Sequence, residues 1–265
     1  MNREKEMLQR VVLLLACLCV TPITAQAVTV GGIEVGDPGG SVGGRSVAEY
    51  TALWWKYVLE TPASTNPFVD PGGALFAPGP FTGDGVTFLY GAPSTDPATP
   101  VTRLASVSAG TNLLVPLIQW VNLKTDPAET AADLLNQLEP LVAGTTNLFA
   151  VINGIDFATA TSRDLLTYRE TFGLPGDSTF GVTFPSSDPV FSGFDGFSTD
   201  LIVADGHWLL LRGIPVGELI VRFGGTNAFG ESVDVGYVLN VVPEPTTLAL
   251  LGVGLAGLGF VRRKA

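Results

Sequence analysis

The stretch from residue 208 to residue 241 reads WLLLRGIPVGELIVRFGGTNAFGESVDVGYVLNV, and its pattern decides the fold class. It contains three apolar or alternating runs, Trp208 to Ile214, Glu218 to Phe223 and Ser232 to Val241, separated by Gly, Pro and Asn residues that favour turns. Alternation with a period of two is typical of β-strands because successive side chains point to opposite faces of a sheet. The stretch therefore predicts three consecutive strands.

Similar runs continue upstream and predict a mainly β body. They are Val86 to Tyr90, Leu113 to Leu123, Leu148 to Phe157 and Thr179 to Phe184. Inside the third run, Asn153-Gly154 is the strongest hairpin signal of the chain, because both residues tolerate a positive φ. Inside the second, Pro116 lacks an N–H and predicts a sheet edge or a bulge. Short strands at this spacing predict a single jelly-roll-like β-sandwich over residues 28–242.

Two short helices interrupt the strands. Ser46 and Glu49 form a capping box that predicts a helix from Val47 to Glu60. Apolar residues cover almost its whole circumference, so we expect it to be largely buried. A second helix is expected to open at Asp126, Pro127 and Glu129 and to end before Pro140, with one apolar stripe facing the body. That stripe consists of Ala131, Leu134, Leu135 and Leu138.

The first helix also carries two adjacent tryptophans that are expected to differ in role. Consecutive side chains leave a helix about 100° apart, so one flat ligand could stack on only one of them. Trp54 shares its face with Tyr50, Tyr57 and Val58 and is predicted to be a core anchor. Trp55 is predicted to be buried less deeply, so any ligand contact would fall to it.

The N-terminus has the three parts of a secretory signal peptide over residues 1–27. Arg3, Lys5 and Arg10 precede an apolar run from Val11 to Val20, and Ala25-Gln26-Ala27 offers small residues for signal peptidase. A membrane anchor would need about 20 apolar residues. A lipoprotein would use Cys17 but would have a short apolar core. The mature N-terminus is therefore predicted to be Val28.

The C-terminus, residues 243–265, also has three parts. Pro243-Glu244-Pro245 stops the preceding fold and is followed by an apolar, glycine-containing stretch from Thr246 to Val261. Arg262, Arg263 and Lys264 follow it and orient the segment with its basic end in the cytoplasm. The pattern predicts a short transmembrane helix; the alternative is a buried C-terminal helix.

This ending resembles the PEP-CTERM sorting signal of Gram-negative bacteria, in which motif, apolar span and basic tail occur in this order. The resemblance implies recognition near Pro243-Glu244-Pro245 by an exosortase, a membrane-embedded transpeptidase-like enzyme. It also implies delivery to the cell surface or to an exopolysaccharide matrix.

The body is similar to a family of uncharacterised exported bacterial proteins. The segments that carry the resemblance are Gly44-Arg45-Ser46, Trp54-Trp55-Lys56, Pro62, Asn66-Pro67, Asp70, Gly85 to Leu89, Val101-Thr102-Arg103, Ala109-Gly110, Asp205-Gly206-His207-Trp208, Gly217-Glu218-Leu219 and Phe223-Gly224-Gly225. Members of this family often carry a cysteine where this chain has Ala105. The resemblance implies a single exported domain and no particular activity.

Composition excludes two classes of site. Residues 28–242 contain 22 acidic and 8 basic side chains, a net charge of −14, so the body lacks the clustered Lys and Arg that bind nucleic acid. Both cysteines, Cys17 and Cys19, lie in the segment that signal peptidase would remove. The mature protein would therefore have no disulfide, thiolate nucleophile or Cys-ligated metal.

Several acidic side chains are the remaining candidates for chemistry. Asp188, Asp195, Asp200 and Asp205 appear in one loop-rich region, where they could hold Ca²⁺ or supply the carboxylate pair of a glycoside hydrolase. Aspartate beside Gly, Pro or Ser is also a common turn former, and this interpretation is favoured.

The only histidine and the tryptophans are also candidates. His207 is interpreted as a turn or strand-face residue rather than a catalytic base. Trp54, Trp55, Trp120 and Trp208 could form a sugar-stacking platform, although core packing is favoured.

Together these features predict a non-enzymatic exported surface or matrix protein that is associated with exopolysaccharide. Its expected partners are signal peptidase, exosortase and the membrane, and no cofactor is expected. The alternative is a carbohydrate-binding module or carbohydrate-active enzyme of the cell envelope, in which Asp195, Asp200, Asp205 or Trp55 would contact calcium or glycan.

Overall fold

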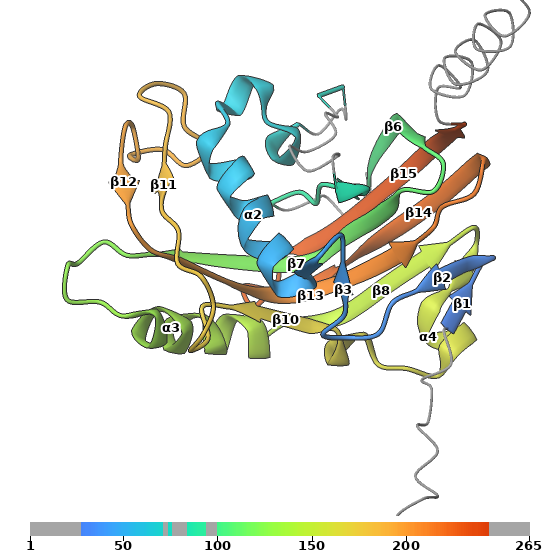
Figure 1. Ribbon diagram of the computed structural model, residues 1–265, viewed down its shortest axis with the longest axis horizontal. Coiled ribbons are helices and arrows are strands. Elements are labelled where there is room, and N and C mark those ends of the chain that lie inside the picture. Colours follow the sequence, from blue (N-terminus) through green and yellow to red (C-terminus); the bar gives the residue numbers. More distant parts are fainter. Residues whose placement is uncertain (1–27, 71–73, 76–83, 94–99, 244–265) are drawn as a thin grey trace, which may run out of the picture.

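The computed structural model describes residues 28–70, 74–75, 84–93 and 100–243 (Figure 1). The predicted signal peptide and the predicted transmembrane helix lie outside these ranges. The described chain is mainly β, with two large sheets, two small two-stranded sheets and three short α-helices. None of the helices in the described ranges could span a bilayer.

The first large sheet has six strands and is built around β13. Its order is β1-β2-β13-β7-β5, and β10 also pairs with β13. The strands are β1 (Val28–Val30), β2 (Ile33–Val35), β5 (Val86–Phe88), β7 (Asn112–Leu123), β10 (Arg169–Phe172) and β13 (Ile202–Arg212). All pairings are antiparallel except that of β5 with β7.

The second large sheet has five strands in the order β6-β15-β14-β8-β9. They are β6 (Val101–Ser108), β8 (Thr146–Ile152), β9 (Ile155–Asp156), β14 (Gly217–Thr226) and β15 (Ser232–Val242). β14 pairs antiparallel with β15 over residues 217–226 and 232–241, whereas β6 runs parallel to β15. The two parallel pairings differ from the all-antiparallel jelly roll that the strand spacing suggested.

The two large sheets pack against each other through one apolar cluster. Leu209 and Leu211 of β13 contribute to it from the six-stranded sheet, and Phe223 and Tyr237 contribute from the five-stranded sheet. This face-to-face arrangement is that of a sandwich, because each sheet buries alternate side chains of its strands.

A helix covers the other face of the six-stranded sheet. Helix α2 (Val47–Glu60) lies across β13 in Figure 1 and shares a second apolar cluster with Trp208 and Leu210. The alternate residues Leu209 and Leu211 face the first cluster, so β13 is buried on both sides. This double burial explains why its sequence reads as a continuous apolar run.

The predicted boundaries of α2 are confirmed at both ends. The Ser46 hydroxyl accepts a hydrogen bond from the Glu49 N–H at 3.1 Å, and the Glu49 carboxylate accepts one from the Ser46 N–H at 2.8 Å. At the other end, the Thr61 N–H donates to the Tyr57 carbonyl. The capping box satisfies two N–H groups that the first turn would otherwise leave free.

The predicted start and end of the second helix are wrong. Helix α3 covers Ala131–Ala143, its capping box is formed by Thr130 and Asp133, and Pro140 lies inside it. Proline removes the hydrogen bond to the carbonyl four residues earlier, that of Asn136, but both residues lie on the exposed face, where water can replace the bond. The apolar stripe is confirmed, because Leu134 and Leu138 pack against Val203 of β13.

Two local turn and edge predictions are confirmed. Asn153 and Gly154 have φ values of 49° and 78° and connect β8 to β9 as a tight hairpin. At Pro116 the β7–β13 register shifts, since Trp208 pairs with Pro116 and His207 pairs with Ile118. Beyond Leu114 no described strand pairs with the outer edge of β7.

Other strands differ from the sequence expectation. The run Trp208 to Ile214 belongs to a strand that already begins at Ile202, and the run Thr179 to Phe184 forms only the short β11 (Val182–Thr183), paired with β12 (Ser198–Thr199). The run Leu148 to Phe157 contains a hairpin followed by the short helix α4 (Phe157–Thr161). Strands β1, β2, β6 and β10, and the hairpin β3 (Ser41–Val42) and β4 (Arg45–Ser46), were not predicted.

Candidate functional site

A pocket of about 370 Å³ lies between α2, the outer edge of β7 and the turn that joins β14 to β15. Its volume is in the range of small-molecule sites. Among the described residues, its lining is Trp54, Trp55, Phe68, Gly91, Ala92, Pro93, Pro116 to Val121, Leu141, Phe191, Asn227, Phe229, Glu231 and Val233. The three elements come from distant parts of the chain, so only the fold brings them together.

Helix α2 supplies one aromatic wall of the pocket. The rings of Trp54 and Trp55 meet edge to face at 4.9 Å, and each also contacts the ring of Phe68. Trp54 is 1% exposed and its indole N–H donates to the Leu89 carbonyl at 3.2 Å. Trp55 is 4% exposed, and its indole N–H has no partner in the described structure.

The two tryptophans differ mainly in the hydrogen bonding of their indole N–H groups and only slightly in burial. Trp54 is the expected core anchor, since its ring also contacts those of Tyr90 and Trp208. Trp55 is only slightly more exposed than Trp54, but its polar atom remains unpaired beside the pocket. Trp54 and Trp55 both line the pocket, but of the two indole N–H groups only that of Trp55 is left without a protein partner.

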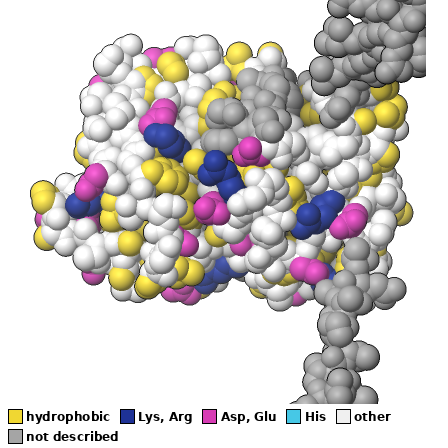
Figure 2. Space-filling model, viewed as in Figure 1, with side chains coloured by type: hydrophobic (Ala, Val, Ile, Leu, Met, Phe, Trp, Pro, Cys, Tyr) yellow, Lys and Arg dark blue, Asp and Glu magenta, His cyan; other side chains and the backbone are white. Residues whose placement is uncertain are grey.

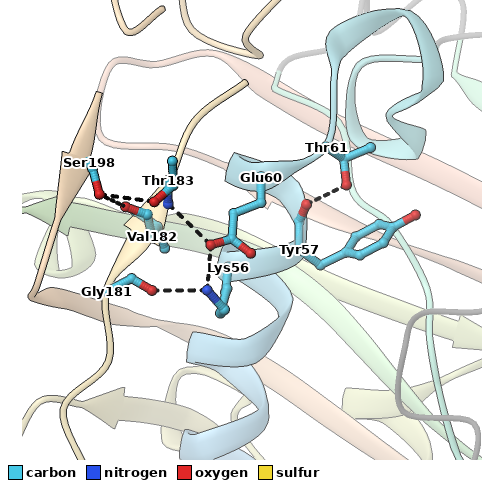
Figure 3. A network of polar contacts seen from close by, with 8 residues as sticks. All are labelled: Lys56, Tyr57, Glu60, Thr61, Gly181, Val182, Thr183 and Ser198. Carbon is cyan, nitrogen blue, oxygen red and sulfur yellow. Dashed lines mark hydrogen bonds and ion pairs between the residues drawn. The ribbon is translucent and has the colours of Figure 1, made fainter. Parts of the chain in front are cut away.

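A network at the C-terminal end of α2 fixes the helix against β11 and β12 (Figure 3). Lys56 pairs with Glu60 and donates to the Gly181 carbonyl at 3.0 Å, while Glu60 accepts from the Thr183 N–H at 3.1 Å. Thr183 and Ser198 share a hydroxyl hydrogen bond at 2.9 Å. These contacts hold the helix that carries Trp54 and Trp55.

The opposite wall combines β7 with the β14–β15 turn. The Trp120 and Phe229 rings meet edge to face at 5.5 Å, and Phe229 is 68% exposed. Asn227 fixes the turn, because its side-chain oxygen accepts from the N–H groups of Phe229 and Glu231 at 2.9 and 3.0 Å. Its amide nitrogen donates to the Glu231 carboxylate at 2.9 Å.

Gln119 and Trp120 add two buried polar atoms without a partner among the described residues, the Gln119 side-chain oxygen and the Trp120 indole nitrogen. The Gln119 amide nitrogen donates to the His207 carbonyl, which fixes the side chain. A Cβ at Gly206 would lie 2.4 Å from the Ile118 backbone oxygen and 2.7 Å from the Gln119 side-chain oxygen, so this position needs glycine. No sequence pattern indicated Gln119, Phe229 or Glu231 as site residues.

The four candidate aspartates do not form one site. Asp188 is exposed, and its carboxylate accepts a hydrogen bond from the Ser64 N–H at 2.9 Å. Asp195 is exposed in the loop before β12, and Asp200 is exposed and pairs with Lys124 at 3.2 Å. Asp205 is buried in the middle of β13, so its predicted place in a loop-rich region is wrong. In the described ranges no three His, Cys, Asp or Glu side chains form a metal-binding group. Calcium binding stays a prediction.

Asp205 belongs to a structural ion-pair network instead. Its carboxylate accepts two hydrogen bonds from Arg169 of the neighbouring β10, at 2.9 and 2.6 Å, and Arg169 also pairs with Glu139 of α3. The hydrogen bonds with both carboxylates raise the pKa of Arg169, and the same guanidinium lowers the pKa of Glu139. This pairing compensates the buried charge and joins α3 to the six-stranded sheet.

His207 was predicted to lie in a turn or on a strand face. It lies on the strand β13, and its side chain is buried. Burial lowers its pKa to about 4, and the nearby Asp205 and Arg169 act in opposite directions. The imidazole is therefore neutral at neutral pH. Its Nδ1 has no partner in the described structure.

The basic side chains elsewhere on the described surface are paired with acidic ones. On the face shown in Figure 2, the Lys and Arg side chains lie beside Asp or Glu side chains. Examples are Arg163 with Asp37 at 2.7 Å and Arg45 with Asp84 at 3.5 Å. Such mixed charge does not present a continuous basic surface.

The C-terminal segment of the chain matches a known protein family. Strand β15 ends at Val242 and is followed by Pro243. Residues 241–264 match the family described as the PEP-CTERM protein-sorting motif. The chain carries a PEP-CTERM sorting signal. No curated protein and no solved structure matches the chain.

The PEP-CTERM signal identifies an exported protein that is directed to the cell envelope and sorted by an exosortase. Of the predicted motif and membrane-orienting residues, Pro243 is described and directly follows β15. Glu244, Pro245, Arg262, Arg263 and Lys264 lie within the matched segment but outside the described residues.

Proposed function

We propose that the protein is a non-enzymatic component of the cell surface or extracellular matrix that associates with exopolysaccharide. Signal peptidase removes residues 1–27, and the segment from Thr246 to Val261 holds the protein transiently in the inner membrane. Arg262, Arg263 and Lys264 keep the basic end in the cytoplasm. An exosortase then acts near Pro243-Glu244-Pro245.

The observation that carries this proposal is the position of the PEP-CTERM motif next to the fold. Strand β15 is paired with β14 over Ser232–Val241 and with β6 over Val235–Val242, and the motif follows without a linker. Cleavage at residues 243–245 would leave every pairing of β15 in place. The body can therefore be released as a complete folded unit.

The surroundings of the buried acidic groups support a non-enzymatic role. Asp205 is bound by Arg169, and Glu170 accepts the Gly39 N–H at 2.7 Å. Glycoside hydrolases place two carboxyl groups on either side of the scissile bond. Among the described residues, Glu231 is the one acidic side chain that lines the pocket. This arrangement favours binding over hydrolysis.

Carbohydrate binding is the second candidate function, and the aromatic pocket favours it. Trp55, Trp120 and Phe229 supply flat apolar surface, and Gln119 and Asn227 supply polar groups beside it. Pockets of this composition are typical of small-molecule sites.

Sorting can be tested by replacing Arg262, Arg263 and Lys264 together with Gln. We expect the precursor to accumulate in the inner membrane and the surface fraction to fall, because these charges orient the short apolar segment. The matched control replaces three body residues, Arg45, Lys124 and Arg212, which removes the same charge. Immunoblotting of cell fractions measures both. Normal processing of the first variant would refute the sorting mechanism.

Association with exopolysaccharide is tested on the same cells. We expect the processed protein to co-sediment with isolated exopolysaccharide and to remain soluble when the polysaccharide is omitted. The assay is repeated with Ca²⁺ and with a chelator, because a body of net charge −14 needs a divalent cation to approach an anionic polymer. Recovery of all processed protein in the polysaccharide-free supernatant would contradict the association.

A further inference from the structure

Three side chains that line the pocket each have one buried polar atom without a partner in the described structure. Two are donors, the indole nitrogens of Trp55 and Trp120, and one is an acceptor, the side-chain oxygen of Gln119. Buried polar groups in native proteins are nearly always hydrogen-bonded, so each unpaired group requires an explanation. Each of these atoms exposes less than 1 Å², so a ligand that both accepts and donates hydrogen bonds would satisfy them once the side chains turn them toward the pocket.

The remaining pocket surface is largely aromatic. Trp55 and Phe68 form one wall, and Trp120 and Phe229 form the other. A sugar ring combines an apolar C–H face, which packs on aromatic rings, with hydroxyl groups that both donate and accept. We propose that this pocket binds one residue of a neutral saccharide chain, an inference that rests on the proposed association with exopolysaccharide.

The charge of the site selects against acidic sugars. Glu231 lines the pocket, and the body as a whole carries a net charge of −14. Both repel an anionic ligand. A purely apolar ligand would leave the indole N–H groups and the Gln119 oxygen unpaired, which is unfavourable in a buried site.

The pocket edge also selects against an added peptide strand. Residues 116–121 of β7 line the pocket, and beyond Leu114 no described strand covers this edge. However, Pro116 has no N–H to donate, and the register shift beside it interrupts the ladder. Both features hinder pairing with a further strand.

The test is isothermal titration calorimetry on the purified full-length protein, in a detergent that has no sugar headgroup. The neutral probes are maltohexaose, cellohexaose and xylohexaose. Polygalacturonate is the anionic probe, the uncharged dye N-phenyl-1-naphthylamine the apolar probe and an alternating Thr-Val hexapeptide the strand probe. We expect saturable binding of at least one neutral oligosaccharide and none of polygalacturonate.

Three variants locate the binding site. Trp55→Phe and Trp120→Phe keep an aromatic ring but remove the N–H, and Gln119→Leu removes the acceptor; each is expected to weaken binding roughly tenfold. The matched control is Trp208→Phe, because the Trp208 indole nitrogen is also buried without a partner but does not line the pocket. It should bind like the wild type. Thermal melting confirms that each variant is folded.

The possible results separate this inference from the proposed function. Failure of all neutral probes, equal binding by folded pocket variants, or selective binding of the peptide or of the apolar dye would overturn the pocket assignment. Loss of exopolysaccharide co-sedimentation with retained oligosaccharide binding would refute the proposed association instead. Co-sedimentation that the pocket variants leave unchanged would refute the pocket as its cause.

Discussion

Replacing His207 with Gln should change how stability depends on pH. The wild-type imidazole is buried and its pKa is lowered from 6.5 to about 4. Between these values the unfolded chain binds a proton that the folded protein does not bind, so the free energy of unfolding falls as the pH decreases. Glutamine does not titrate, and the Gln119 hydrogen bond is kept because it goes to the backbone carbonyl of residue 207.

The size of the effect follows from the pKa shift. One pKa unit corresponds to about 1.4 kcal/mol, so the shift is worth about 3 kcal/mol below pH 4 and about 2 kcal/mol at pH 5. The burial of Glu170 raises its pKa and acts in the opposite direction, since that stabilisation is present at low pH and is lost as the pH rises. Both proteins contain Glu170, so the difference between them isolates His207.

Urea unfolding followed by tryptophan fluorescence measures this difference from pH 7.5 to pH 4.5. The glutamine variant is expected to have a constant offset from the wild type above pH 7 and to gain stability relative to it as the pH falls. A difference that stays constant over the whole range would refute the conclusion that His207 is held neutral by burial.

Three other changes test the packing and the processing. Trp54→Ala should lower the free energy of unfolding by about 3 to 5 kcal/mol, because it empties a fully buried site and removes a hydrogen bond; a wild-type melting curve would contradict this. Asp205→Asn should cost about 3 kcal/mol by leaving Arg169 with a weaker partner, measured by urea unfolding against Asp200→Asn as the exposed control. N-terminal sequencing of the exported protein should begin at Val28, and a lipidated Cys17 would disprove the signal-peptidase site.

Local sequence signals predicted the elements that depend on neighbouring residues. The capping box of Ser46 and Glu49 located the start of α2, and Asn153-Gly154 located the β8–β9 turn. Alternation predicted β14 and β15, and the continuous apolar surface of α2 predicted its burial. In each case the deciding interaction lies within a few residues along the chain.

Local signals failed where a distant partner outweighed them. Asp205-Gly206-His207 reads as a turn, but it is part of β13 because β7 and β10 pair with it and Arg169 compensates the buried carboxylate. Pro140 was expected to end the second helix. Helix α3 continues past it to Ala143 because Pro140 lies on the solvent-exposed side of the helix.

The sequence by itself determined the C-terminal sorting signal, the mainly β composition and the buried first helix. These depend on contiguous motifs and on the period of apolar residues, both of which can be read along one segment. Only the tertiary structure decided which strands pair and which side chains share a pocket. Trp55, Trp120 and Phe229 are far apart in the chain, and their meeting requires the long-range pairing of β7 with β13 and the packing of α2 on that sheet.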